Sequence, residues 1–462
     1  MNRLLISGTS SNCGKTTITM ALLAAFQNKG FDIASFKCGP DYIDPMFHRK
    51  VFNVKTHNLD PYFSTEEMLC QQFIRNKGKD LSIIEGAMGF YDGIGVEGKA
   101  SAWEVAKSIK APVVLILDAK GMSNSAAAII KGFKEFKSES MIEGVIFNGI
   151  SPMLYPLLSG IVESIGVKPY GFLPRKEEYS IGSRNLGLIT ADEITDIKNK
   201  IKGLSELAEK YIDLDGLYEL AKQAPIIESD YDYFDSIKED GPDMEKSSIN
   251  EEGWGMEKPK PRIAVSKDNA FCFMYEENIE ILEDLGCEIV YFSPLNDEKL
   301  PPNISGLYLC GGYPELYTEQ LSNNRKLADE IKDVMIKGIP AIAECGGFMY
   351  LHDSIENIPM VGFIEGNCIK TDKLQRFGYV EIRALKDNLL SSKDQSIRVH
   401  EFHYYDSENC GEDFMATKAS NGLEYLCCHA SDSYYAGFPH IYLSANPEFA
   451  KSFVKHAREW EA

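Results

Sequence analysis

A glycine-bounded loop near the start of the chain limits the folds that this sequence can adopt. The apolar run 3–6 predicts a short strand, residues 8–17 read Gly-Thr-Ser-Ser-Asn-Cys-Gly-Lys-Thr-Thr, and 18–26 predict a helix. A strand, such a loop ending in Lys-Thr and a helix form a P-loop, whose backbone amides and helix N-terminus hold phosphate groups. The alternative is a chance occurrence of Gly-Lys-Thr.

The P-loop also predicts where ATP would bind. We expect Lys15 to meet the β- and γ-phosphates and Thr16 to hold Mg²⁺. The strict pattern has a glycine where Thr9 stands, so this loop is a variant in which Gly8 comes one residue earlier. The expected ATP-binding residues are Gly8, Thr9, Asn12, Gly14, Lys15, Thr16 and Thr17.

Apolar runs and helical segments alternate after the P-loop. The alternation predicts an α/β fold with a doubly wound, mostly parallel sheet. The runs expected to form its further strands are 31–36, 81–84, 111–117, 142–147 and 167–172.

Acidic side chains lie at the ends of two of these runs. Asp41 and Asp44 come after the run 31–36, and Glu85 directly follows the run 81–84. Open α/β sheets bind ligands at the carboxyl ends of their strands. An acid that ends an apolar strand beside a P-loop is typical of a Walker B site, which reaches Mg²⁺ directly or through water. We therefore expect Thr16, Glu85 and Asp41 at the metal, although either aspartate could instead form a turn.

Charged and polar side chains near the strand ends could contact an anionic substrate. The candidates are Lys37, Tyr42, Asp44 and Arg184, with Arg175 and Lys176 as further cations. Exposure on the surface is the ordinary fate of an arginine and is the alternative for these cations. Asn148, at the end of another predicted strand, could contact the base of a nucleotide or simply cap its strand.

The second half of the chain contains a pattern typical of a nucleophile elbow. The apolar run 339–343 leads to Cys345, Gly346 and Gly347 and then to a helix-compatible segment. This order predicts a strand, a tight turn and a helix, with an exposed thiol that faces the positive end of the helix. Both features favour the reactive thiolate. The alternative is a buried structural cysteine.

A nucleophilic cysteine needs oxyanion donors and a base. The oxyanion candidates are the amides of Gly346, Gly311 and Gly312. His440 opens an apolar run after a turn, far from the cysteine in sequence, and is the favoured base. His400 and His403 alternate on a predicted strand and compete for this role.

Composition limits the partners and the compartment. The 462 residues carry a net charge of −21, which repels nucleic acid and anionic membranes and requires a local basic pocket for an anionic substrate. The eleven cysteines show no CxxC pair, and neither a secretory signal nor a transmembrane run is evident. We expect free thiols in a reducing cytoplasm.

An acidic stretch divides the chain. Residues 228–257 contain eleven acids and two lysines without a sustained period, which predicts a solvated linker. The predicted organisation is a P-loop domain at 1–226, a linker at 227–259 and a second α/β domain at 260–462.

Several motifs occur together in a fixed order along nearly the whole chain. They include Gly8-Thr-Ser-Ser-Asn-Cys-Gly-Lys-Thr-Thr, Lys37-Cys-Gly-Pro-Asp-Tyr-Ile-Asp-Pro, Glu85-Gly-Ala-Met-Gly-Phe-Tyr-Asp-Gly, Gly311-Gly-Tyr-Pro-Glu-Leu, Glu344-Cys-Gly-Gly-Phe-Met-Tyr-Leu and His400-Glu-Phe-His-Tyr. In this order they resemble the cobyrinic acid a,c-diamide synthases. That family joins a dethiobiotin-synthetase-like ATP domain to a class I glutamine amidotransferase domain of flavodoxin-like α/β fold.

The resemblance implies a ligase of cobalamin biosynthesis that uses ATP, Mg²⁺ and L-glutamine. It would amidate the a and c acetate carboxylates of cobyrinic acid through an acyl phosphate. Cys345 would release ammonia from glutamine, with His440 as its base. Ile441 and Tyr442 follow this histidine, where many class I amidotransferases have Pro-Glu, so no third carboxylate is evident and a looser dyad is expected.

Other functions stay open at this point. The same reaction could act on another tetrapyrrole polycarboxylate, nickel-sirohydrochlorin or hydrogenobyrinate. A P-loop switch ATPase is a non-enzymatic alternative, but such proteins carry a further lysine where this chain has Ser10 and have no use for Cys345. A third alternative is a degenerate amidotransferase domain that serves only as a binding module and does not hydrolyse glutamine. The oligomeric state is also open, with a homodimer as the candidate.

Overall fold

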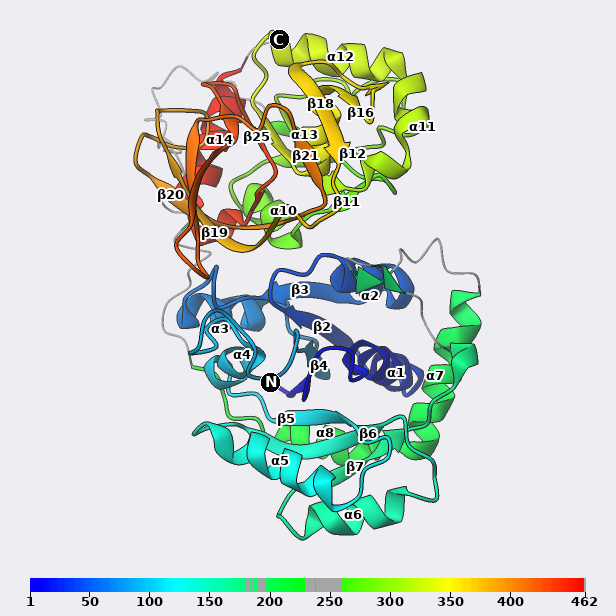
Figure 1. Cartoon of the computed structure of the whole chain (residues 1–462). Coiled ribbons are helices and arrows are strands. Elements are labelled where there is room, and N and C mark those ends of the chain that lie inside the picture. The colour runs from blue at the N-terminus through cyan, green and yellow to red at the C-terminus, as the bar shows by residue number, and fades with distance from the viewer. Residues whose placement is uncertain (180–182, 185–186, 189–195, 229–236, 238–259, 461–462) are drawn as a thin grey trace, which may run out of the picture. The chain divides into compact units, whose positions relative to one another are not determined.

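The computed structural model describes residues 1–179, 183–184, 187–188, 196–228, 237 and 260–460 (Figure 1). Contacts within the chain divide it into two compact units, Met1–Tyr231 and Asp232–Ala462. The predicted linker lies almost wholly outside the described residues, so the three predicted domain bounds stay predictions.

The first unit is built on a seven-stranded sheet with the order β3-β2-β4-β1-β5-β6-β7, in which every neighbouring pair is parallel. Its strands are β1 (Arg3–Gly8), β2 (Ile33–Cys38), β3 (Lys55–Leu59), β4 (Leu81–Glu85), β5 (Val113–Asp118), β6 (Ile142–Asn148) and β7 (Lys168–Leu173). Most strand residues are buried, as is usual in a parallel sheet covered on both faces. The predicted doubly wound, mostly parallel sheet is confirmed.

Helices connect these strands, and β1 and β4 end beside each other at the P-loop. The helices are α1 (Lys15–Asn28), α2 (Ile43–Phe52), α3 (Glu66–Asn76), α4 (Ala102–Ser108), α5 (Asn124–Phe136), α6 (Tyr155–Glu163), α7 (Ile197–Tyr211) and α8 (Leu214–Lys222). Helix α1 is buried from Ile18 to Phe26, and α7 packs alongside it (Figure 1). A helix apolar on all sides is expected to be enclosed in this way.

The second unit contains a six-stranded sheet with the order β12-β10-β13-β15-β25-β24. Only its last pair is antiparallel. The strands are β10 (Arg262–Ser266), β12 (Glu288–Phe292), β13 (Gly306–Leu309), β15 (Ala341–Glu344), β24 (His429–Ala430) and β25 (Tyr434–Gly437), and the helices are α10 (Glu276–Asp284), α11 (Thr318–Asn323), α12 (Arg325–Ile336), α13 (Gly346–Leu351) and α14 (Pro447–Glu459).

A mostly antiparallel region completes the second unit. Its five-stranded sheet has the order β23-β22-β19-β20-β26, with β19 (Arg376–Ala384), β20 (Ser396–His403), β22 (Phe414–Lys418), β23 (Glu424–Cys427) and β26 (His440–Ile441). A four-stranded sheet joins β16 (His352–Ile355), β17 (Ile358–Pro359), β18 (Ile364–Lys370) and β21 (Tyr405–Ser407), and a two-stranded one joins β11 (Phe271–Phe273) and β14 (Gly311–Gly312). The pairing of β20 with β26 sets His400 opposite His440.

All eleven cysteines are free thiols. None of the helices in the described parts of the chain has the length and apolar character that a membrane span requires.

Candidate active sites

The P-loop has the local structure that its sequence predicts. Strand β1 ends at Gly8, and α1 begins at Lys15. Gly14 has φ 101° and lies against Asn148, because an added β-carbon would be 2.0 Å from Nδ2 of that side chain. Asn148 Nδ2 donates a hydrogen bond to the carbonyl of Cys13 at 2.9 Å. A glycine is therefore required where the loop turns into the helix.

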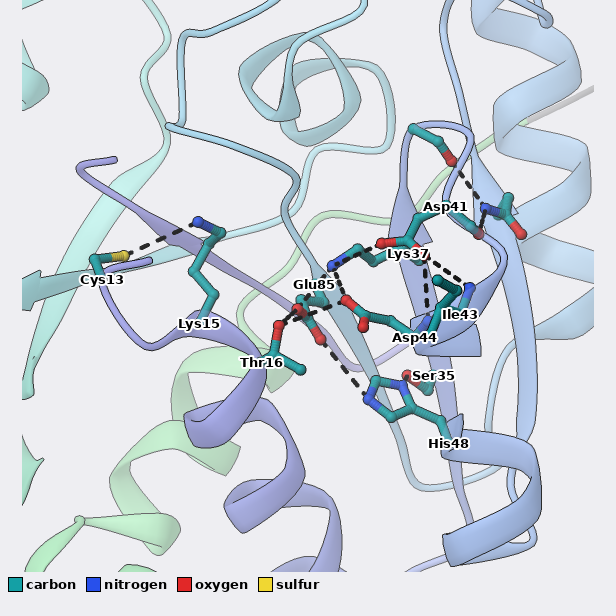
Figure 2. Close-up of polar contacts among 12 residues, drawn as sticks. Cys13, Lys15, Thr16, Ser35, Lys37, Asp41, Ile43, Asp44, His48 and Glu85 are labelled. Atoms are coloured by element: carbon teal, nitrogen blue, oxygen red, sulfur yellow. Dashed lines mark hydrogen bonds and ion pairs between the residues drawn. The ribbon is translucent and has the colours of Figure 1, made fainter. Parts of the chain in front are cut away.

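The Lys15 ammonium lies over its own loop. It donates to the carbonyl of Ser10 at 2.9 Å and lies 4.0 Å from the sulfur of Cys13. Burial lowers the pKa of Lys15. In Figure 2 this side chain extends toward Cys13 and away from the acidic residues beside Thr16.

A second lysine, Lys37, contacts acids that follow β2 and the acid that ends β4. Lys37 Nζ lies 2.5 Å from Asp44 Oδ2, 2.8 Å from Glu85 Oε1 and 3.8 Å from Asp41 Oδ2. Burial alone would lower the pKa of Lys37, but Asp44, Glu85 and Asp41 outweigh burial and hold it well above its ordinary value. Thr16 Oγ1 donates to Glu85 Oε1 at 2.6 Å. Figure 2 shows these groups converging.

The two aspartates after β2 have different surroundings. Asp41 Oδ1 accepts hydrogen bonds from the amides of Ile43 and Asp44 at the start of α2. Asp44 Oδ2 instead lies 3.5 Å from Thr16 Oγ1. Burial and then Asp44 raise the pKa of Asp41 to about 7, whereas Lys37 overcomes burial and lowers the pKa of Asp44. The position beside Thr16 and Glu85 thus belongs to Asp44, and the metal role expected for Asp41 stays a prediction.

His48 is a further member of this site, and the sequence analysis did not identify it. Its Nε2 lies 3.7 Å from Glu85 Oε2, and its Nδ1 lies 3.0 Å from Ser35 Oγ. Burial lowers the pKa of His48 to about 4. Its spacing four residues after Asp44, one turn along α2, was the signal that could have revealed it.

A cavity of about 340 Å³ opens beside the P-loop. Asn12, Gly14 and Thr17 line it on the loop side. Asn148, Arg175 and Lys176 also line it, together with Asp118, Lys120 and Tyr179. Its volume is at the lower end of the range for ligand pockets. The two cations proposed for a substrate therefore lie at this cavity. Arg184 is on β8 (Ser183–Arg184), and its side chain lies outside the described residues.

The predicted elbow is present in the second unit. Strand β15 ends at Glu344, Cys345 has φ 46° and ψ −102°, and α13 follows at Gly346. A left-handed φ in a residue other than glycine costs about 1–3 kcal/mol and is typical of functional turns. This strained turn fixes the thiol between a strand end and a helix start.

The expectation of an exposed thiol on this elbow is wrong. Cys345 is 6% exposed, and burial raises its pKa, with Glu315 adding to the effect. The double-glycine turn packs directly on the elbow, since a β-carbon added to Gly346 would lie 2.8 Å from the Gly312 nitrogen and 2.9 Å from Pro314 Cδ. The resting thiol is therefore neutral, and its activation requires a base.

The oxyanion candidates lie together at this turn. The Gly346 amide donates toward the thiol of Cys345 and lowers its pKa in opposition to burial. A β-carbon added to Gly311 would lie 2.4 Å from His440 Cε1. The structure thus gathers Gly311, Gly312 and Gly346 with the favoured base, and their roles stay predictions.

The three histidines considered as bases are close to one another. His440 and His400 face each other across β26 and β20, and burial followed by His400 and His403 lowers the pKa of His440 to about 3. His403 stacks on Phe438 at a centroid distance of 3.9 Å, and its Nδ1 lies 2.6 Å from the carbonyl oxygen of Tyr405. Contact with the glycine turn distinguishes His440 from the other two.

Sequence reasoning missed a carboxylate beside His440. Glu344 Oε2 lies 3.8 Å from His440 Nδ1, and both side chains are almost fully buried. Glu344 Oε1 accepts from the Ile441 amide at 2.9 Å, and Oε2 accepts from the Tyr308 hydroxyl at 3.0 Å. Burial raises the pKa of Glu344 to about 8. A carboxylate thus lies beside this histidine, on the residue that precedes Cys345 and not on one that follows His440.

Two family models match the two units. Residues 4–188 match the CobQ/CobB/MinD/ParA nucleotide binding domain, and residues 262–447 match the CobB/CobQ-like glutamine amidotransferase domain. Together with the P-loop and the cysteine elbow, these matches define a nucleotide binding domain joined to a glutamine amidotransferase domain.

Relatives that match almost from end to end give the particular family. Cobyrinate a,c-diamide synthase of Clostridium tetani is 39% identical over 98% of this chain and 100% of the relative. The proteins of that name from Clostridium acetobutylicum and Methanocaldococcus jannaschii are 38% and 36% identical, over 98% of this chain and 100% and 99% of their own lengths. The chain belongs to the cobyrinate a,c-diamide synthase family.

Proposed function

We propose that this protein amidates the a and c acetate carboxylates of cobyrinic acid, using ATP and glutamine, in cobalamin biosynthesis. The observation that carries the proposal is that relatives of one name match the chain almost from end to end, across both units. A carboxylate resists attack by ammonia, so the γ-phosphoryl group of ATP is first transferred to it. Ammonia then attacks the acyl carbon and phosphate leaves, which gives the amide, ADP and phosphate.

The phosphate groups of ATP would bind at the P-loop. Its amides and the start of α1 would hold the phosphates, and Lys15 would exchange its contact with the Ser10 carbonyl for a phosphate oxygen. The cavity beside Asn148 would accept the nucleoside.

The residues beside the P-loop fit Mg²⁺. Thr16, Glu85 and Asp44 bring hard oxygen donors together, and magnesium prefers one or two carboxylates with phosphate and water as its other ligands. When bound, Mg²⁺ would neutralise phosphate charge.

The elbow would supply ammonia. His440 takes the thiol proton of Cys345, and the sulfur attacks the amide carbon of glutamine while the oxygen is held by the amide of Gly346 and the turn at Gly311 and Gly312. The proton then passes to the leaving nitrogen and ammonia departs. Water hydrolyses the thioester to glutamate and restores the thiol.

The groups that hold the tetrapyrrole are less defined. Lys37 is committed to Asp44 and Glu85, so it would act on the substrate only together with them. Tyr42, Asp44 and Arg184 stay substrate candidates. The homodimer and the cytoplasmic location also stay proposals, the latter supported by the eleven free thiols.

The test is mass spectrometry of cobyrinate incubated with the protein, Mg-ATP and glutamine. We expect two successive acid-to-amide mass changes that require ATP. Cys345→Ala should abolish the reaction with glutamine but retain it with ammonium, whereas Lys15→Ala should lose both. Amidation of nickel-sirohydrochlorin or hydrogenobyrinate in place of cobyrinate would change the substrate assignment. An active Lys15→Ala protein would contradict the role proposed for the P-loop.

A further inference from the structure

Glu344 occupies a place from which it can act on the catalytic histidine. It is the last residue of β15, immediately before Cys345, and it is 1% exposed. Its Oε2 lies 3.8 Å from His440 Nδ1, the ring nitrogen next to the main chain. The same carboxylate accepts a hydrogen bond from the amide of Ile441, the residue that follows this histidine. One side chain thus reaches both the ring and the backbone of the β26 segment.

A buried network fixes this carboxylate. The Tyr308 hydroxyl donates to Glu344 Oε2 at 3.0 Å and accepts from Asn278 Nδ2 at 3.0 Å. Asn278 also donates to the carbonyl of Ile441 at 2.7 Å and accepts from the amide of Leu443 at 2.8 Å. These contacts join α10, β13 and β15 to the segment that carries the histidine. The geometry of the pair is therefore specified from both sides.

Glu401, another buried acid of this unit, is engaged elsewhere. Glu401 is hydrogen-bonded to the Tyr425 hydroxyl and lies 3.9 Å from Arg376, with His403 at 4.0 Å. Its charge is opposed by a guanidinium, whereas the hydrogen bonds to Glu344 come from a hydroxyl and a backbone amide. The two acids serve different histidines, and only Glu344 lies beside His440.

We propose that Glu344 is a positioning residue that orients His440 and stabilises its imidazolium. The proposal rests on the proposed glutamine hydrolysis at Cys345. When the thiol proton moves to His440, the ring becomes positive while the sulfur becomes the nucleophile. A carboxylate beside Nδ1 favours that charged ring and holds the other nitrogen toward the thiol, as the acid of a Ser-His-Asp triad does.

Several titratable groups face Glu344 and must be considered in any pH profile. They are Tyr308 and Cys310 from β13 and the residue after it, Cys345 from the elbow, Tyr435 from β25 and His440 from β26. Of these, only His440 can become a cation. A change in its protonation is therefore the one that a carboxylate at this position stabilises.

The test compares Glu344→Gln, Glu344→Asp and the control Glu288→Gln, which removes an exposed acid from β12 of the same sheet. Glutaminase kinetics with the full chain should show kcat lowered about 100-fold in Glu344→Gln, because the base is misplaced, with KM changed less than about threefold. Glu344→Asp should recover part of the loss, and the control should match the wild type.

A second readout separates positioning from simple stability. Iodoacetamide labelling of Cys345, followed by peptide mass spectrometry at several pH values, reports the thiolate formed with His440. Labelling at neutral pH should fall about tenfold in Glu344→Gln. Wild-type kcat and an unchanged labelling profile in this variant would overturn the proposal.

If Glu344→Gln does not fold, Tyr308→Phe tests whether Glu344 positions His440. This variant keeps the Glu344 carboxylate but removes the hydroxyl that orients it. Its kcat should fall about tenfold, and a wild-type kcat would count against the proposal. A wild-type protein without any glutaminase activity would instead refute the proposed function, which keeps the two failures distinct.

Discussion

The two units bury carboxylates in opposite ways. In the first, Asp44 and Glu85 share the ammonium of Lys37 at 2.5 and 2.8 Å. In the second, Glu344 accepts hydrogen bonds from the Tyr308 hydroxyl and the Ile441 amide and lies beside a histidine whose pKa is lowered to about 3. Accordingly the pKa of Asp44 is lowered, whereas burial still raises the pKa of Glu85 and raises that of Glu344 to about 8.

This difference matches what each site would do. A site for polyphosphate and Mg²⁺ binds ligands that are already charged, so the empty site can contain fixed charges of both signs. A glutaminase site binds a neutral amide, and charge arises only when a proton moves from the thiol to the histidine. We infer that the first site is organised by permanent ion pairs, and the second by hydrogen bonds to a carboxyl group that gains a cationic partner only when His440 is protonated.

Acid should therefore destabilise the second unit more than the first, and this is the largest effect we expect. His400, His403 and His440 have pKa values lowered to about 3, 4 and 3, against about 4 for His48 alone in the first cluster. A lowered histidine pKa gives stability above the unfolded value near 6.5 that is lost as pH falls. Between pH 7 and 5 each histidine should remove about 2 kcal/mol, or up to about 6 kcal/mol for the three, while the raised pKa of Glu344 offsets part of this loss.

Hydrogen exchange with peptide mass spectrometry reads each unit separately within the full chain. Amides of β15 and β25 should lose protection on going from pH 7 to pH 5, after correction for intrinsic exchange, by more than amides of β1 and β4. Equal losses in the two units would contradict the contrast between neutral and paired groups.

Removing the cation of the first site should have the next largest effect. Lys37→Met leaves Asp44 and Glu85 buried without their ammonium, which should lower the free energy of unfolding of this unit by about 3–5 kcal/mol. Synthesis with ammonium should also be lost. Chemical denaturation followed by hydrogen exchange in β2 and β4 measures the change.

Lys29→Met is the matched control, because its ion pair with Asp215 is largely exposed. Lys29→Met should change the free energy of unfolding by no more than about 0.5 kcal/mol. If both lysine variants were equally stable, the cluster around Lys37 would not depend on its ion pairs.

The smallest of the three effects concerns the fit of His440 against the glycine turn. Gly311→Ala would place a β-carbon 2.4 Å from His440 Cε1 and displace the ring. We expect glutaminase kcat to fall about 100-fold with ammonium-dependent synthesis retained. Gly132→Ala, where an added β-carbon meets nothing within 4 Å, should be neutral. Full glutaminase activity in Gly311→Ala would show that the contact between Gly311 and His440 does not determine the position of the base.

Local sequence patterns predicted the parts of the molecule that are local in space. The P-loop, the parallel strands that follow it and the strand-turn-helix at Cys345 each depend on neighbouring residues, so glycine spacing and apolar runs sufficed. Thr16 and Glu85 were also expected together, and they are hydrogen-bonded at 2.6 Å.

Features set by distant contacts could not be derived in this way. The burial of Cys345 depends on a turn about thirty residues earlier in the chain, and the partner of His440 precedes the cysteine by one position. Spacing alone also could not distinguish Asp41 from Asp44, because the difference arises when Asp41 accepts the amides at the start of α2.

The backbone of Cys345 has a consequence for the history of such chains. At φ 46° any β-carbon is strained by about 1–3 kcal/mol, and glycine would relieve the strain. Selection for ammonia release must continuously oppose this gain in stability. In descendants of this protein that no longer use glutamine, we expect glycine to be the most frequent replacement at position 345, because it relieves this strain.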